Sequence, residues 1–147
     1  MARLAEATSA RDVAIVRELF AEYVRMVDEP CCFVDFEREL ASLPGEYRLF
    51  LADDAAGCVA VRLLDPQTAE MKRLYVRAAH RGKGLGRALA EAAITAAREA
   101  GCARIVLDTL PKMAEAQGLY RTLRFRPIAP YLKNPTPGAL CFELSLS

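Results

Sequence analysis

The sequence predicts an α+β fold in which helices cover both faces of a mixed, mostly antiparallel central sheet that contains one local parallel pair of strands. A strand-like stretch over 70–76 runs into a glycine-rich turn and then a helix, an order typical of a parallel connection. Strand-like stretches over 47–52 and 58–64 flank a short turn, which predicts an antiparallel hairpin. The length of 147 residues suits one domain, so we expect a single domain over 1–147.

The first part of the chain predicts a short strand followed by two helices. We expect a strand over 2–7 and then a helix that Thr8 or Ser9 caps. Apolar side chains at three- and four-residue spacing predict this helix, namely Val13, Val16, Phe20, Val24 and Val27. A second helix is expected over 35–43, ending at Pro44-Gly45.

The last part of the chain predicts a strand, a helix and two closing strands. Gly101 is suited to end the preceding helix, and a strand follows over 104–108. Pro111 fits the first turn of the next helix. The closing strands are expected over 126–132 and 139–146.

Glycines mark the centre of the chain. Gly82, Gly84 and Gly86 follow the strand, and a helix begins there, with Leu85, Leu89, Ala92 and Ala96 on one face. The first N–H groups of a helix lack internal partners and carry partial positive charge. A helix that begins at glycines is therefore a candidate anion site, most often for phosphate.

Basic side chains gather in the same stretch. The stretch 70–87 has one acidic residue, Glu70, and six basic residues, which are Lys72, Arg73, Arg77, Arg81, Lys83 and Arg87. The whole chain, in contrast, is nearly balanced, with 20 Lys+Arg and 19 Asp+Glu. This charge indicates either an anion site or a solvated basic surface. The overall charge balance argues against a protein that mainly binds nucleic acid. The local basic stretch keeps nucleic-acid binding as an alternative hypothesis.

Two phosphate-loop motifs do not fit the glycines. The nucleoside-triphosphate loop needs Lys-Ser/Thr after its last glycine, where this chain has Arg87-Ala88. The dinucleotide fingerprint needs Gly or Ala where this chain has Arg87 or Leu89. What remains is Arg81-x-x-Gly84-x-Gly86.

This loop resembles the acyl-CoA pyrophosphate loop of the GNAT family of N-acetyltransferases. A second stretch, AQGLYRTLRF over 116–125, is similar to that family's A-x-x-L-Y-x-x-x-G-F. The resemblance implies the GNAT fold and transfer of an acetyl group from acetyl-CoA to a primary amine of a small molecule or peptide. A non-catalytic acyl-CoA-binding regulator on the same fold is the other hypothesis.

The resemblance also assigns roles to residues. It places the pantetheine arm on the backbone of Leu74, Tyr75 and Val76, and the pyrophosphate on Arg81, Gly82, Lys83, Gly84, Leu85, Gly86 and Arg87. It makes Tyr120 the acid that protonates the leaving thiolate; otherwise Tyr120 is a core aromatic. Arg124 and Met113 stand where the family often has glycine and asparagine, so one polar contact to the cofactor is missing.

An amine acceptor must lose a proton before it attacks, and a carboxylate can take that proton. Glu70 is the candidate by position, and a strand-end charge is the alternative. Strand alternation predicts Glu70 and Lys72 on one face and Arg73 on the other. The resemblance places the acceptor pocket between the N-terminal helices and the last strands, where Tyr23, Glu29, Phe33, Tyr131 and Asn134 are candidates.

The five cysteines predict free thiols rather than disulfides. Residues 1–8 contain no apolar stretch of signal-peptide length, so we expect a cytoplasmic protein without a membrane span. Cys58, Cys102 and Cys141 have apolar neighbours typical of a core, and the spacing of Cys31-Cys32 does not fit zinc. His80 is expected on a surface turn. We expect no bound metal. Formation of a homodimer is an open alternative.

Overall fold

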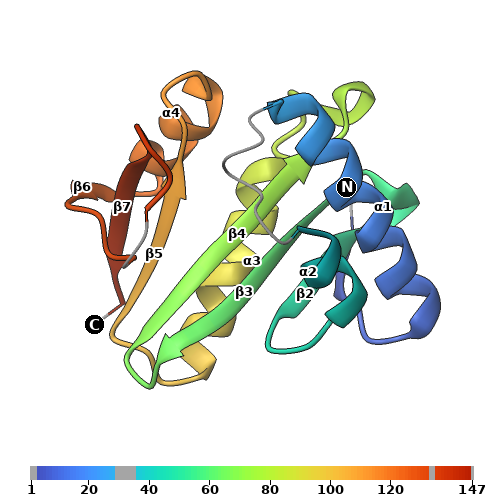
Figure 1. Cartoon of the computed structure of the whole chain (residues 1–147), viewed down its shortest axis with the longest axis horizontal. Helices are drawn as coiled ribbons and strands as arrows, with labels where there is room; N and C mark the ends of the chain where they lie inside the picture. The colour runs from blue at the N-terminus through green and yellow to red at the C-terminus, as the bar shows by residue number, and fades with distance from the viewer. Residues whose placement is uncertain (1–2, 29–35, 133–134, 147) are drawn as a thin grey trace.

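Figure 1 shows a computed structural model of the chain, which describes residues 3–28, 36–132 and 135–146. In chain order the elements are β1 (Leu4–Glu6), α1 (Ala10–Val27), α2 (Phe36–Ser42), β2 (Arg48–Ala52), β3 (Gly57–Asp65), β4 (Thr68–Val76), α3 (Leu85–Glu99), β5 (Arg104–Thr109), α4 (Ala114–Thr122), β6 (Arg126–Ile128) and β7 (Leu140–Ser145). Short 3-10 turns lie at Asp53–Ala55 and Ala78–His80. The predicted order of strands and helices is confirmed.

The strands form one seven-stranded sheet in the order β1-β2-β3-β4-β5-β7-β6. Helices α1 and α2 cover one face and α3 covers the other (Figure 1). All neighbouring strands are antiparallel except β4 and β5, as the sequence predicted. A mixed sheet with helices on both faces is therefore confirmed.

Strands β4 and β5 are paired only at their beginnings. The pairs are Thr68 with Arg104, Ala69 with Ile105 and Glu70 with Val106. Beyond this point the two strands diverge toward the top of Figure 1. The second half of β4 therefore has an edge to which β5 forms no hydrogen bonds.

Two apolar cores hold the helices to the sheet. Side chains of α3 pack with Val59, Met71 and Ile105 on one face, and α1 packs with Leu49 and Cys58 on the other. Ser9 caps α1, since its Oγ accepts a hydrogen bond from the backbone N–H of Asp12 at 3.1 Å. This confirms one of the two predicted caps. The end of the central helix is confirmed as well, because Gly101 follows α3 with φ of +83°.

Some boundaries differ from the sequence prediction. Pro111 does not lie in the first turn of α4, which begins at Ala114 after a separate turn. Strand β6 ends at Ile128 rather than continuing to 132, and Pro130, which lacks the N–H that a ladder needs, lies two residues beyond this end. The first residue of the predicted second helix, Asp35, lies outside the described residues.

The predicted alternation of β4 is wrong at Arg73. Lys72 pairs with Ala60 and Tyr75 with Cys58, so β4 has one residue more than β3 between these pairs. Arg73 takes up this bulge with φ of +59°. Its guanidinium consequently reaches Glu39 on α2, on the face where Lys72 and Tyr75 also point.

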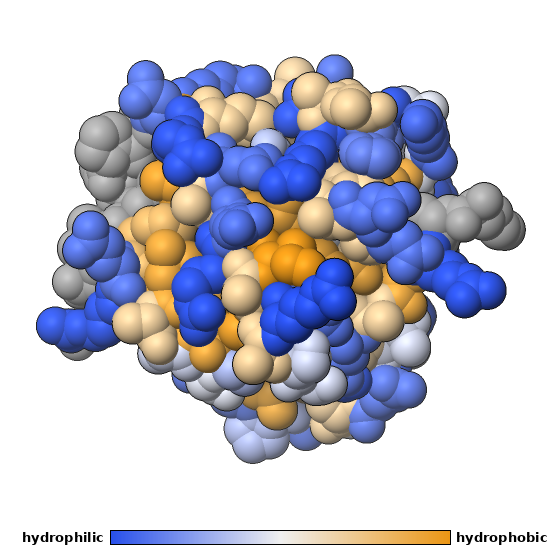
Figure 2. All heavy atoms as spheres, turned by 90° about the vertical axis from the view of Figure 1, so that its right-hand side faces the viewer, coloured by the Kyte–Doolittle hydropathy of each residue, from blue (hydrophilic) through white to orange (hydrophobic). Residues whose placement is uncertain are grey.

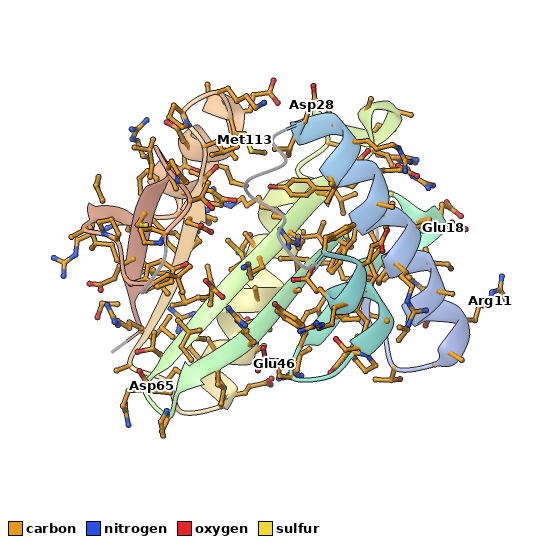
Figure 3. The ribbon with its side chains drawn as sticks, in the orientation of Figure 1. Arg11, Glu18, Asp28, Glu46, Asp65 and Met113 are labelled. Atoms are coloured by element: carbon orange, nitrogen blue, oxygen red, sulfur yellow. The ribbon has the colours of Figure 1, made fainter. Side chains whose placement is uncertain are left out.

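The face shown in Figure 2 carries hydrophilic side chains with hydrophobic ones visible between them near its middle. Charged side chains such as Arg11, Glu18 and Asp65 project outward at the periphery (Figure 3). Within the part of the chain that the structure describes, none of the helices combines the length and apolar character needed to span a membrane.

Candidate active site

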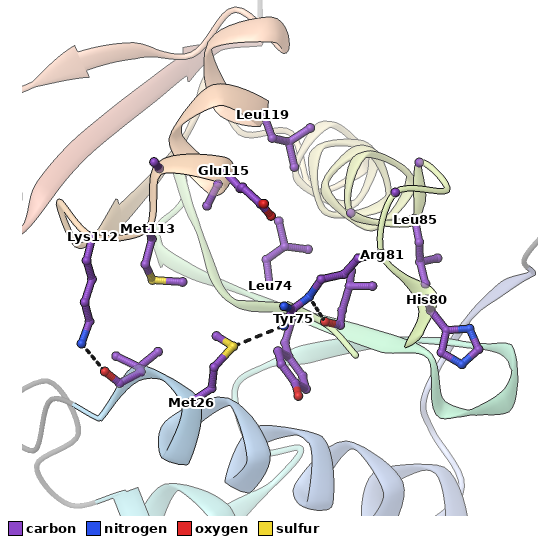
Figure 4. A pocket seen from close by; sticks show the side chains of 17 residues that line it. Met26, Leu74, Tyr75, His80, Arg81, Leu85, Lys112, Met113, Glu115 and Leu119 are labelled. Carbon is purple, nitrogen blue, oxygen red and sulfur yellow. Dashed lines mark hydrogen bonds between the residues drawn. The ribbon is translucent and has the colours of Figure 1, made fainter. Parts of the chain in front are cut away.

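A cavity of about 580 Å³ lies where β4 and β5 diverge. Its walls come from the end of β4, the glycine turn, the start of α3, the beginning of α4 and the end of α1 (Figure 4). It is lined by most of the predicted cofactor residues, which are Leu74, Tyr75, Val76, Arg81, Gly82, Gly84, Leu85 and Gly86. Lys83 and Arg87 belong to the same turn but are not among the lining residues.

The backbone of the turn explains its glycines. Gly82 and Gly84 have φ of +78° and +79°, in the left-handed region that favours glycine. Gly84 is also the N-cap of α3, so the unpaired first-turn N–H groups of α3 begin at the cavity wall. The positive end of the helix dipole lies there as well.

Two long cationic side chains tie the cavity walls together (Figure 4). The Nε of Arg81 donates to the carbonyl of Val76 at 2.9 Å, and its Nη2 lies 3.3 Å from the sulfur of Met26. Lys112 donates to the carbonyl of Val27. These contacts join the end of α1 to the glycine turn and to the loop before α4.

Carboxylates from elsewhere in the chain pair with half of the basic stretch. Arg73 binds both oxygens of Glu39 at 2.9–3.1 Å, and Arg77 binds Glu22. Arg87 pairs with Glu91 at 3.3 Å on the surface of α3. The concentration of positive charge expected from the sequence is therefore smaller in the folded chain, which weakens the nucleic-acid hypothesis.

A second cavity, of about 50 Å³, adjoins the first and shares Leu74 and Met113 with it. The other lining residues come from four elements and are Tyr23, Met71, Lys72, Arg73, Asp108, Thr109 and Tyr120. Met113 lies between the start of α4 and the end of α1 (Figure 3). The small cavity brings the predicted acid Tyr120 and the predicted acceptor residue Tyr23 to one space.

Tyr120 is 6% exposed and packs against the rings of Phe125 and Phe142, with centroids 5.8 and 6.2 Å away. Burial raises the pKa of its hydroxyl well above the ordinary value. Tyr120 is therefore a core aromatic that also lines the small cavity, and the acid role predicted for it stays a prediction.

Glu70 is completely buried inside β4, which begins at Thr68. Its Oε1 accepts a hydrogen bond from the Nε of Arg62 and its Oε2 accepts one from the hydroxyl of Tyr131, both at 2.7 Å. The alternative of an exposed strand-end charge is therefore wrong. Glu70 lines neither of the two cavities, and the catalytic role predicted for it stays a prediction.

Asp108 is a carboxylate at the small cavity that the sequence analysis assigned no role. It lies near the end of β5 and lines the cavity together with Tyr120. Burial raises the pKa of Asp108, and Lys72 and Arg73 oppose this shift by their positive charge. One sequence signal could have indicated it: a single acidic residue directly follows the buried strand residues Ile105–Leu107.

The predicted acceptor residues have mixed positions. The hydroxyl of Tyr23 reaches the sulfur of Met113 at 3.8 Å, and its ring packs edge-on against Tyr75. Tyr131 bonds to Glu70. The remaining three candidates, Glu29, Phe33 and Asn134, lie outside the described residues.

Within the described part of the chain, the cysteines and the histidine are not arranged as a metal site. Cys58, Cys102 and Cys141 are buried free thiols, as expected, while Cys31 and Cys32 lie outside the described residues. His80 is half-buried and lines the large cavity. Over residues 3–28, 36–132 and 135–146, no three His, Cys, Asp or Glu side chains are grouped so that they could hold a metal ion.

Comparison with known proteins gives consistent results. The sequence model of the acetyltransferase (GNAT) family matches residues 13–125. The chain is 33% identical over 147 aligned residues to an uncharacterized N-acetyltransferase of Schizosaccharomyces pombe, with 93% of this chain and 90% of the relative covered.

Two solved structures share the fold at low sequence identity. The yncA protein of Salmonella typhimurium, solved with its cofactor acetyl-CoA, has a TM-score of 0.78 and 21% identity, covering 99% of this chain and 94% of that one. A Bacillus subtilis acetyltransferase in complex with CoA has a TM-score of 0.73 and 19% identity, covering 100% of both chains.

Proposed function

The chain belongs to the acetyltransferase (GNAT) family, and from that premise we propose that it transfers the acetyl group of acetyl-CoA directly to a primary amine of a small molecule or peptide. Membership confirms the resemblance that the two sequence motifs indicated. The choice of acetyl-CoA, the residues that bind it and the nature of the amine belong to the proposal.

The separation of β4 from β5 is the observation that carries this proposal. Beyond Glu70 and Val106 the edge of β4 forms no pairs with β5, and the two adjoining cavities extend from the glycine turn to Tyr120. An extended pantetheine arm can pair with an open strand edge as another strand would. The diphosphate would then lie at the N-terminus of α3, where N–H groups and the helix dipole favour anions. The yncA protein, which shares the fold, was solved with acetyl-CoA, and this supports the choice of acetyl-CoA as the donor.

In the proposed reaction, the nitrogen–carbon bond to the acetyl group forms as the carbon–sulfur bond breaks. Backbone N–H groups of β4 near Leu74 would stabilise the charge that develops on the thioester oxygen. Tyr120 would donate its proton to the leaving sulfur, a role that its place in the small cavity supports. The tyrosinate then regains a proton from water.

The surroundings of the two carboxylates favour Asp108 as the group that takes the proton of the amine. A general base must come within hydrogen-bond reach of the amine, directly or through one water. Asp108 lines the small cavity beside Tyr120, whereas both oxygens of buried Glu70 already accept hydrogen bonds. We propose that Glu70 instead has a structural role and holds the side chains of Arg62 and Tyr131 in place through these hydrogen bonds.

The experiment that tests the function has two stages. Acetyl-CoA should first raise the melting temperature of the purified chain, and release of the CoA thiol should then depend on an added amine. Thermal stabilisation without thiol release for any amine would favour the non-catalytic regulator. If acetyl-CoA does not change the melting temperature, the assignment of the large cavity is contradicted.

A further inference from the structure

Lys72 on β4 and Asp108 on β5 lie opposite each other at the point where the strands have separated. Glu70 pairs with Val106 in the last parallel pair. Side chains alternate along a strand, so Lys72 and Asp108 are the next residues on the same face of each. Both line the small cavity next to Tyr120. An ammonium group and a carboxylate from separate strands thus border the space where the acceptor must react.

The other charged side chains around this space are already paired. The guanidinium of Arg73 is held by both oxygens of Glu39, and the carboxylate of Glu70 by Arg62 and Tyr131. Lys72 makes no direct ion pair with any residue that the structure describes. Its electrostatic interaction is with Asp108 across the cavity.

This arrangement discriminates between kinds of amine. A simple alkylamine would bring a lone positive charge toward the ammonium group of Lys72, and like charges at short distance repel. A molecule with a carboxylate next to its amine carries both signs of charge. Its ammonium group can pair with Asp108 while its carboxylate pairs with Lys72. The small cavity has space for only a few atoms, so these two groups fit while a side chain extends beyond it.

We propose that the acceptor is a free α-amino acid whose amine is bound by Asp108 and whose carboxylate is bound by Lys72. The inference rests on the proposed transferase function and narrows its substrate class. It excludes the N-terminus of a peptide and a simple alkylamine as preferred acceptors, because neither has a carboxylate on the carbon that carries the amine.

The test uses three acceptors with one side chain and the full chain as the enzyme. A panel of free amino acids first identifies the best side chain. That amino acid is then compared with its carboxamide and with its decarboxylated amine, and each kcat/KM is expressed per unprotonated amine. We expect the free amino acid to be preferred by about 10- to 100-fold, the usual range for a charge-assisted hydrogen bond.

Variants of Lys72 test whether this preference comes from its charge. Lys72→Met should lower kcat/KM for the free amino acid by about 10- to 100-fold and change it little for the other two acceptors. Lys72→Arg should retain part of the preference because it keeps the charge. Arg98→Met, which removes an exposed cation from the last turn of α3, is the control and should leave all three rates unchanged.

Two results would overturn the proposal. One is equal use of the amino acid and its carboxamide by the unaltered protein. The other is an equal loss for all three acceptors in Lys72→Met, which would mean that Lys72 acts on Asp108 and not on the substrate.

Failure of the transferase function itself gives a different result, in which acetyl-CoA binds and no amine releases thiol. The substrate class is then decided by thermal shift on the CoA-bound protein with the same three compounds. Stabilisation by the amino acid alone, lost in Lys72→Met, supports the inference, and equal shifts contradict it.

Discussion

The hydroxyl of Tyr131 donates a hydrogen bond of 2.7 Å to the buried carboxylate of Glu70, although 61 residues separate the two in the sequence. Arg62 occupies the other oxygen of this carboxylate and also pairs with Glu46 at 2.7 Å. Glu70 therefore links β4 to β3 and to the segment after β6. Removing one partner of such a buried ion pair lowers the stability of the fold, because the other charge then stays buried without an opposite charge beside it.

The first prediction separates the two carboxylates by their pH–rate profiles. The pKa of Asp108 is raised above its ordinary value by burial, so the base becomes active as pH rises through this raised pKa. Asp108→Asn should remove the rise in turnover with pH that this base produces, which is the acidic limb of the pH–rate profile. It should also lower turnover by about 10²–10⁴-fold near neutral pH. Turnover should recover partly at high pH, where the amine deprotonates without help. The measurement is a full profile with a saturating amine.

Glu70→Gln is the matched comparison, since it also changes one carboxylate to an amide. It should lower the melting temperature and leave the shape of the pH–rate profile unchanged. The opposite pattern, with the limb lost in Glu70→Gln and kept in Asp108→Asn, would establish Glu70 as the base and refute the role proposed for Asp108.

The second prediction concerns the acid. Tyr120→Phe removes only the hydroxyl and keeps the ring contacts with Phe125 and Phe142. Turnover should fall by about 10²–10⁴-fold, while the melting temperature and acetyl-CoA affinity stay close to those of the unaltered chain. Tyr47→Phe, which removes a hydroxyl that lines neither cavity, is the control and should retain most of the turnover. An unchanged rate in Tyr120→Phe, with chemistry shown to be rate-limiting, would leave Tyr120 as a core aromatic alone.

Local patterns in the sequence were sufficient to predict the helices, the hairpin and the turn at Gly82–Gly86, because each depends on spacing within a few residues. The interactions of Glu70 were not predictable in this way. They depend on which residues of β3 and of the segment after β6 the sheet brings beside it. The position of Arg73 depends on a bulge, and strand periodicity alone assigns it to the wrong face.

Asp108 shows the same limit at the site. Its distance from Tyr120 along the chain gives no indication that both line one cavity. Asp108 lies near the end of β5 and Tyr120 lies in α4, and only the folded chain brings both side chains to the small cavity. Sequence reasoning located the glycine turn because a turn is contiguous, and it missed Asp108, whose place at the small cavity depends on the folded arrangement of several elements.

The third prediction tests the anion site at the start of α3. Gly84→Glu places a negative charge where the diphosphate should bind, and it should abolish the thermal stabilisation by acetyl-CoA. That stabilisation is expected to be about 2.7 kcal/mol at about a hundred times the dissociation constant. Gly138→Glu is the control, since Gly138 has nearly the same φ and open space around its Cβ but does not line the cavity. Equal acetyl-CoA binding by the Gly84→Glu protein and the unaltered chain would refute the loop assignment.

The last prediction concerns stability and compares two glycines that differ in their surroundings. A Cβ on Gly57, at the start of β3, would lie 2.6 Å from the carbonyl oxygen of Tyr75, which is a backbone atom of the neighbouring strand. Because neither strand can move without disturbing the ladder that positions β4, Gly57→Ala should lower the free energy of unfolding by roughly 1–3 kcal/mol. In Gly118, inside α4, a Cβ would meet nothing within 4 Å. Gly118→Ala should therefore raise the free energy of unfolding by about 0.5–1 kcal/mol, since alanine is the better helix former. Urea unfolding of both variants measures the difference, and a Gly57→Ala protein as stable as the unaltered chain would contradict the close approach of β3 and β4.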